Sequence, residues 1–176
     1  MSDNGGLGII GIGNVLMGDD AIGPSVIALL DSRWEWPEMV ALLDAGAPGP
    51  ELATLLESYE AVIVVDAVDA EYPPGTLVRL ERPAILEGLT TKVRTPHDPG
   101  LTAALSHLDL LGQGPSSVCL LGMVPDRANM APGLSDVARS TLPRLLEMVL
   151  EEVAAFCDPP KKRETPLPEN LWWERR

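Results

Sequence analysis

The sequence predicts an α/β fold, with one sheet covered by helices on both faces. Two observations carry this prediction. Apolar runs of strand length alternate with segments of helical periodicity, and a glycine-rich loop joins the first run to the first helical segment. Such alternation is typical of strand–helix–strand units. The 176 residues, of which 45% are hydrophobic, suffice for one domain with a substantial core.

The expected elements follow in order along the chain. Positions 22, 26, 29 and 30 are apolar, which marks one face of a helix. Continuous apolar runs indicate buried strands, and Pro73-Pro74-Gly75 marks a turn before one of them. We therefore expect strands at Leu7–Ile12, Met39–Leu43, Ala61–Val65, Gly75–Leu80 and Ser117–Val124, and helices at Ala21–Arg33, Glu51–Tyr59, Leu101–Leu111 and Leu134–Phe156.

The predicted domain covers residues 1–157, and residues 158–176 form a proline-rich tail. We expect the tail to be flexible, because its prolines prevent a long helix. Trp172 and Trp173 are costly to leave exposed, however, and could dock on a surface. Cys119 and Cys157 are expected to be free thiols.

The net charge of −13 argues against nucleic acid as a partner, because phosphate binding needs a basic surface. An acidic body attracts cations and basic peptides, or merely keeps the protein soluble. No apolar run reaches the length of a membrane span, and the first residues lack a signal-peptide pattern. We expect a cytoplasmic monomer that does not bind a membrane.

The loop after the first strand suits a cation better than a dinucleotide. Gly11 and Gly13 match the start of the dinucleotide fingerprint, but position 16 is Leu instead of the third glycine. Asp19 and Asp20 would repel a phosphate held there. Alternatively, one of these aspartates caps the following helix, which leaves the other without a structural role.

Three aspartates come at or after strand ends, and a histidine lies in a loop stiffened by prolines. Asp20 follows the first strand, while Asp44 and Asp66 end the second and third. Because ligands bind beyond the carboxyl ends of strands in open α/β sheets, we expect these carboxylates to converge on one crevice. His97 alone would be an ordinary loop residue, as we expect for the helical His107. With Asp20 and Asp66 it makes a plausible zinc or nickel site with open positions.

These features together resemble the hydrogenase maturation endopeptidases, which trim the C-terminus of the large subunit of nickel–iron hydrogenases. The resemblance runs from about Leu7 to Phe156 and rests on several ordered motifs. They are Gly11-Ile-Gly-Asn-Val-Leu-Met-Gly-Asp-Asp-Ala-Ile-Gly, Leu43-Asp-Ala-Gly, Val64-Val-Asp-Ala, Pro74-Gly-Thr, Pro96-His-Asp-Pro-Gly-Leu and Gly122-Met-Val-Pro.

The resemblance implies a three-layer α/β/α fold of the phosphorylase/hydrolase-like kind. Its sheet has five mostly parallel strands, with the fourth as the candidate for the antiparallel one. The resemblance further implies an aspartic-type, metal-recognising endopeptidase whose metal ligands and catalytic residues are Asp20, Asp66 and His97. The nickel arrives with the hydrogenase large-subunit precursor, so no tightly held metal of the enzyme's own is expected. Asp19 and Asp44 are candidate general bases.

Two departures from the family pattern affect the site. The first ligand is often Glu in relatives and is Asp20 here, which is one methylene shorter. The loop after the second strand often reads Asp-Gly-Gly-Thr and here is Asp44-Ala-Gly-Ala. The family links this loop, with Asp44 and Gly46, to substrate recognition.

Two other functions remain open at the level of sequence. One is a stand-alone metallohydrolase that keeps its own zinc. The other is a non-catalytic nickel-sensing or chaperone module that uses the same three ligands.

Overall fold

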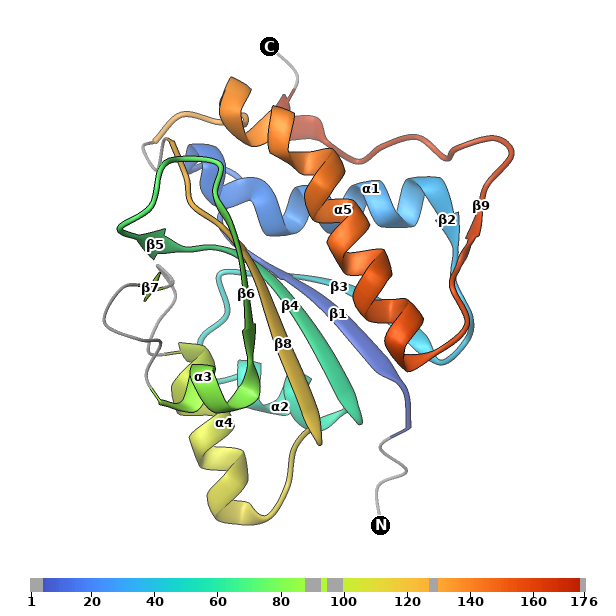
Figure 1. Cartoon of the computed structure of the whole chain (residues 1–176). Coiled ribbons are helices and arrows are strands. Elements are labelled where there is room, and N and C mark those ends of the chain that lie inside the picture. Colours follow the sequence, from blue (N-terminus) through green and yellow to red (C-terminus); the bar gives the residue numbers. More distant parts are fainter. Residues whose placement is uncertain (1–4, 88–92, 95–99, 127–129, 175–176) are drawn as a thin grey trace.

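A computed structural model describes residues 5–87, 93–94, 100–126 and 130–174 of the chain. Its centre is a five-stranded sheet in the order β3-β1-β4-β8-β6 (Figure 1). The strands are β1 (Leu7–Ile12), β3 (Val40–Gly46), β4 (Ala61–Ala67), β6 (Leu77–Glu81) and β8 (Ser117–Met123). All neighbours pair in parallel except β6, which runs antiparallel to β8. Both the mostly parallel sheet and its antiparallel fourth main strand are confirmed.

Helices cover the two faces of the sheet as two separate layers. In Figure 1, α5 (Asp136–Phe156) crosses one face together with α1 (Ile22–Arg33). The other layer holds α2 (Leu52–Glu57), α3 (Arg82–Leu86) and α4 (Gly100–Leu111). The three-layer α/β/α prediction is therefore confirmed.

Each face of the sheet contributes to its own apolar core. Ile9 packs with the α1 and α5 side chains, whereas the adjacent Ile10 packs with those of α2 and α4. This alternation is the pleat of a strand buried on both faces, and it explains why β1 reads as one continuous apolar run.

Several short elements lie outside the expected set. They are η1 (Gly18–Ala21), α3, the two-residue strands β2 (Trp34–Glu35), β5 (Asp69–Ala70), β7 (Val93–Arg94) and β9 (Lys161–Lys162), and η2 (Trp172–Glu174). Elements this short contain too few residues to show a period. The strands β3 and β4 also run further than expected, so Asp44 and Asp66 lie within the C-terminal parts of these strands.

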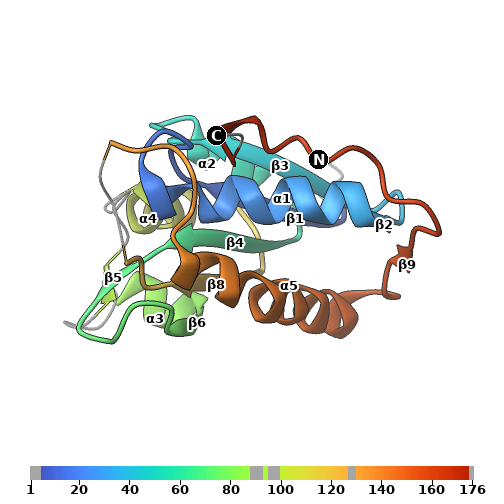
Figure 2. The ribbon, with the colours of Figure 1, turned by 90° about the horizontal axis from the view of Figure 1, so that it is seen from above.

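The C-terminal tail packs along α1 (Figure 1, Figure 2). β9 pairs antiparallel with β2, and the backbone of Leu167 exchanges hydrogen bonds of 2.6 and 2.9 Å with Ser32. The docked tryptophan is Trp173, which is 6% exposed, whereas Trp172 remains 53% exposed. Tertiary contacts therefore order a segment whose composition alone suggests disorder.

Within the described residues, no helix is both long and apolar enough to span a membrane. Cys119 and Cys157 are free thiols, as expected.

Candidate functional site

The carboxyl ends of β1, β3 and β4 lie at one edge of the sheet. Gly11 near the end of β1 is aligned with Asp44 on β3 and with Val65 on β4. Asp66 is the next residue of β4. The loop that follows β1 leads into η1, which contacts β4 and carries Asp20. The prediction that Asp20, Asp44 and Asp66 share one edge is therefore confirmed.

Glycines allow η1 and α1 to lie directly on these strand ends. Gly13 has a φ of +145°, and a Cβ there would lie 1.8 Å from the carbonyl oxygen of Asp20. A Cβ on Gly23 would lie 2.2 Å from the Ile12 oxygen and 2.6 Å from the Val65 oxygen. The glycines of this motif thus serve close backbone packing, which places Asp20 against the end of β4.

Asp20 and Asp66 are both nearly inaccessible to solvent. Asp20 is 6% exposed, and its Oδ2 accepts a hydrogen bond of 2.7 Å from the backbone N–H of Asn14. Asp66 is 1% exposed, and the pleat of β4 puts it on the same face as Val64. Two buried carboxylates therefore lie on contacting elements at this edge of the sheet.

The capping interpretation of the two aspartates is wrong for the helix that follows them. The N-cap of α1 is Ala21, and no side chain caps it. Asp19 instead accepts hydrogen bonds from the backbone N–H and the hydroxyl of Ser135, at 2.6 and 2.8 Å, and from the Asp126 backbone N–H at 2.9 Å. It therefore binds the start of α5, a distant helix.

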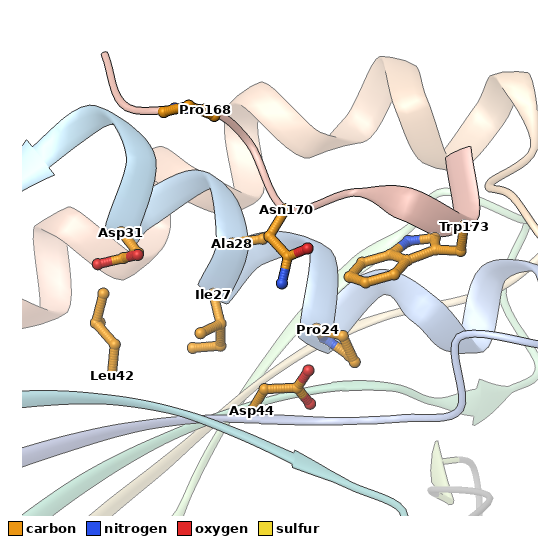
Figure 3. Close-up of a pocket in the computed structure, with 9 residues that line it drawn as sticks. All are labelled: Pro24, Ile27, Ala28, Asp31, Leu42, Asp44, Pro168, Asn170 and Trp173. Carbon is orange, nitrogen blue, oxygen red and sulfur yellow. The ribbon is translucent and has the colours of Figure 1, made fainter. Parts of the chain in front are cut away.

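Asp44 and Asp66 lie on opposite faces of the sheet. Its side chain points to the α1 side of the sheet, into a pocket of about 290 Å³ (Figure 3). The tail supplies the opposite wall through Pro168, Asn170 and Trp173. The expected convergence of three carboxylates is thus wrong for Asp44, since Asp66 lies on the α2–α4 face with Val64.

The Asp44 turn is bound to the glycine loop through its backbone. Asp44 Oδ1 accepts a hydrogen bond of 3.0 Å from the Gly46 N–H, and the Gly46 oxygen accepts one of 2.8 Å from the Gly13 N–H. Gly46 has a φ of +58°, which favours glycine. The pocket and the Asp20 loop are therefore neighbours.

His97 lies outside the described residues. Among the residues that the structure does describe, no group of three or more His, Cys, Asp or Glu side chains is arranged to hold a metal ion. His107 is exposed on α4, as expected, and lines a groove of about 520 Å³ between α2 and α4. The proposed ligand set of Asp20, Asp66 and His97 thus stays a prediction.

Neither cysteine is placed as a nucleophile. Burial raises the pKa of the Cys119 thiol to about 12, with a smaller contribution from the nearby Glu152 carboxylate. Burial also raises the pKa of Cys157. Both thiols are therefore protonated near neutral pH, whereas the reactive form of a cysteine is the thiolate.

Sequence analysis did not identify Asn14 or Ser135 as part of this region. Asn14 lies inside the quoted glycine motif and carries no separate signal. The expected helix Leu134–Phe156 included Ser135, but α5 begins at Asp136. Ser135 is its N-cap, whose side chain accepts a hydrogen bond from the Ala138 N–H, and a serine before a helical run is a typical N-cap signal.

Comparisons with known proteins agree on one family. The family model described as hydrogenase maturation protease matches residues 24–152. Hydrogenase 2 maturation protease of Escherichia coli K12 is 32% identical over 143 residues, which cover 81% of this chain and 87% of that protein. Hydrogenase expression/formation protein HupD of Thiocapsa roseopersicina is 30% identical, over 89% of this chain and 71% of that protein.

Solved structures agree with the sequence comparisons. The hydrogenase maturating endopeptidase HybD from E. coli superposes with a TM-score of 0.83 at 30% identity. The superposition covers 90% of this chain and 98% of the E. coli protein.

Proposed function

Because the chain belongs to the hydrogenase maturation protease family, we propose that it cleaves the C-terminal peptide from a nickel-loaded [NiFe]-hydrogenase large-subunit precursor. The observation that carries this proposal is the pair of buried carboxylates, Asp20 and Asp66, at the edge where strands β1 and β4 end. Carboxylate oxygens are among the ligands that bind divalent metal ions in proteins, so nickel held by the precursor would bind at this edge.

The nickel belongs to the substrate in this proposal. Two carboxylates and the imidazole of His97 would bind a divalent ion weakly and leave coordination positions open. Thiolates of the precursor would fill those positions, so that only a loaded precursor is bound for cleavage. Peptide-bond hydrolysis then releases the C-terminal peptide. We place this reaction in the cytoplasm and expect a monomeric enzyme.

The two candidate general bases have geometries that suit other roles. Asp19 accepts hydrogen bonds from Ser135 and Asp126 and is fully buried. Asp44 faces the α1 side of the sheet, away from Asp66. We therefore assign Asp44, with Gly46, to recognition of the precursor.

The pocket around Asp44 suits a basic side chain of the precursor. Asp31 and Asp44 contribute carboxylates, and the other lining residues include no Lys or Arg. Leu42, Ile27 and Trp173 offer apolar walls on which an aliphatic stem can pack (Figure 3). The acidic body of the chain would favour the approach of such a segment.

Cleavage of loaded and nickel-free precursor by purified variants tests the proposal. Asp20→Asn, Asp66→Asn and His97→Ala should each abolish peptide release, measured by mass spectrometry, while His107→Ala should cleave normally. The wild type should ignore precursor that lacks nickel. Near-normal cleavage by the Asp20 and Asp66 variants would remove these residues from the site.

Metal content separates the alternative functions. A wild-type protein that purifies with stoichiometric zinc and cuts nickel-free precursor would be the stand-alone metallohydrolase. A protein that binds loaded precursor without releasing any peptide would be the sensing or chaperone module.

A further inference from the structure

Asp19 and Asp20 are adjacent residues of η1 whose carboxylates serve different parts of the fold. Asp20 accepts its hydrogen bond from Asn14 within the glycine loop. Asp19 accepts from Ser135, which is 116 residues further along the chain. The short helix η1 is thus fixed at Asp20 by the glycine loop and at Asp19 by the N-cap residue of α5.

The Asp19 carboxylate meets the positive end of a long helix. Ser135 is the N-cap of the 21-residue helix α5, and it donates both its N–H and its hydroxyl to Asp19. The hydroxyl oxygen of Ser135 also accepts from the Ala138 N–H at 3.1 Å. An anion at a helix N-terminus is stabilised by the helix dipole and by these charge-assisted bonds. This contact is therefore a strong link between η1 and α5.

The tail holds the same segment from its other side. Glu174 Oε1 accepts a hydrogen bond of 2.7 Å from the Leu134 N–H, and Glu174 forms an ion pair with Arg139. Arg139 Nε in turn donates to the Leu134 oxygen at 3.1 Å. The neighbouring Trp173 donates from Nε1 to Ser25 of α1 at 3.3 Å. Leu134 and Ser135 are thus held between Asp19 and Glu174.

We propose that Asp19 is a positioning residue for Asp20, and that Glu174 of the tail completes the arrangement by holding the start of α5. Asp19 fixes η1 against α5, and η1 sets where Asp20 stands relative to Asp66 on β4. The tail lies beyond residues 24–152, which are the residues that the family model matches. The inference rests on the proposed function only for its activity assay.

The first test is Asp19→Asn, which keeps the shape of the side chain and removes its charge. The amide can accept from fewer of the three donors, so η1 should shift. We expect kcat for loaded precursor to fall about 10- to 100-fold, as for other residues that orient a ligand, while KM changes less than about twofold. Glu174→Gln should cause a smaller fall in kcat. The double variant should lose less than the product of the two single losses, because both residues hold one segment.

The shape of the pH–rate profile separates positioning from acid–base catalysis. If Asp19 positions Asp20, the Asp19→Asn profile keeps both limbs at a lower level. If Asp19 is the general base, its acidic limb disappears, and the positioning role is overturned.

Ser32→Ala is the matched control for simple loss of stability. It removes the hydroxyl that donates to the Leu167 oxygen at 2.6 Å, at the C-terminal end of α1. It should lower the melting temperature without lowering kcat. If the kcat losses of all variants instead track their melting temperatures, Asp19 is only structural and the proposal fails.

Hydrogen exchange keeps the inference testable if the proposed function is wrong. In Asp19→Asn, the Asn14 and Asp20 amides should exchange at least about tenfold faster, while those in the middle of β4 should not change. Unchanged exchange at Asn14 and Asp20 would overturn the inference, whatever reaction the enzyme catalyses. A wild type that fails to cleave loaded precursor would overturn only the proposed function.

Discussion

Asp66 and Asp44 lie near the carboxyl ends of the two strands that flank β1, yet their surroundings differ. Asp66 is 1% exposed inside the sheet edge, next to an η1 helix held by close backbone packing. Asp44 is exposed and opens into a pocket whose far wall is the tail (Figure 3). The difference suggests a division of labour: buried, rigid groups suit metal recognition and cleavage, and an open pocket suits selection of the precursor.

The largest predicted difference between these regions concerns their glycines. Gly13→Ala should destabilise the fold by about 3 kcal/mol or more, because the new Cβ clashes with backbone and Gly13 has a positive φ. Gly46→Ala should cost only about 1 kcal/mol, because a Cβ there meets nothing within 4 Å and only the left-handed backbone opposes it. Urea unfolding followed by circular dichroism measures both free energies. Equal losses would show that the two loops are equally constrained.

The strand ends could be predicted from sequence, but the faces on which their side chains lie could not. Continuous apolar runs located β1, β4 and β8, and an aspartate at the end of such a run must lie near the sheet edge. The same continuity hides the pleat, because strands buried on both faces show no alternation. Nothing in the sequence therefore indicated that Asp44 and Asp66 point to opposite faces.

Contacts between residues that are distant in sequence could not be predicted from the sequence either. The family resemblance was correct, whereas the metal-ligand role that it implies for Asp20 stays a prediction. The link between Asp19 and Ser135 spans 116 residues, and no local pattern predicts a contact of that kind. The docking of Trp173 likewise depends on a site formed by α1 and α5, which exists only in the folded protein.

The tail contributes to the pocket and to the fold through one of its two adjacent tryptophans. Trp173→Ala should lower the free energy of unfolding by about 3 kcal/mol, because a buried indole and its hydrogen bond to Ser25 are lost. Trp172→Ala should cost about 1 kcal/mol, since this exposed ring mainly loses its edge-to-face contact with Trp173. Thermal and urea unfolding of both variants test the difference. A similar small loss for both would mean that the tail adds little to stability.

The smallest predicted effect is the one that tests the division of labour most directly. Asp44→Asn keeps a side-chain oxygen that can accept the hydrogen bond from the Gly46 N–H, and it removes only the charge in the pocket. It should raise KM for loaded precursor about 3- to 10-fold, as expected for the loss of one partly exposed charge contact, and leave kcat nearly unchanged. This difference in KM between variant and wild type should be smaller at high salt, because salt screens the attraction between Asp44 and the precursor in the wild type. Asp31→Asn, on the same pocket wall, should act in the same direction and more weakly, because its carboxylate lies further from the turn that carries Gly46. A large fall in kcat with KM unchanged would place Asp44 in the cleavage step itself. The different positions of Asp44 and Asp66 would then be a structural difference without a difference in function.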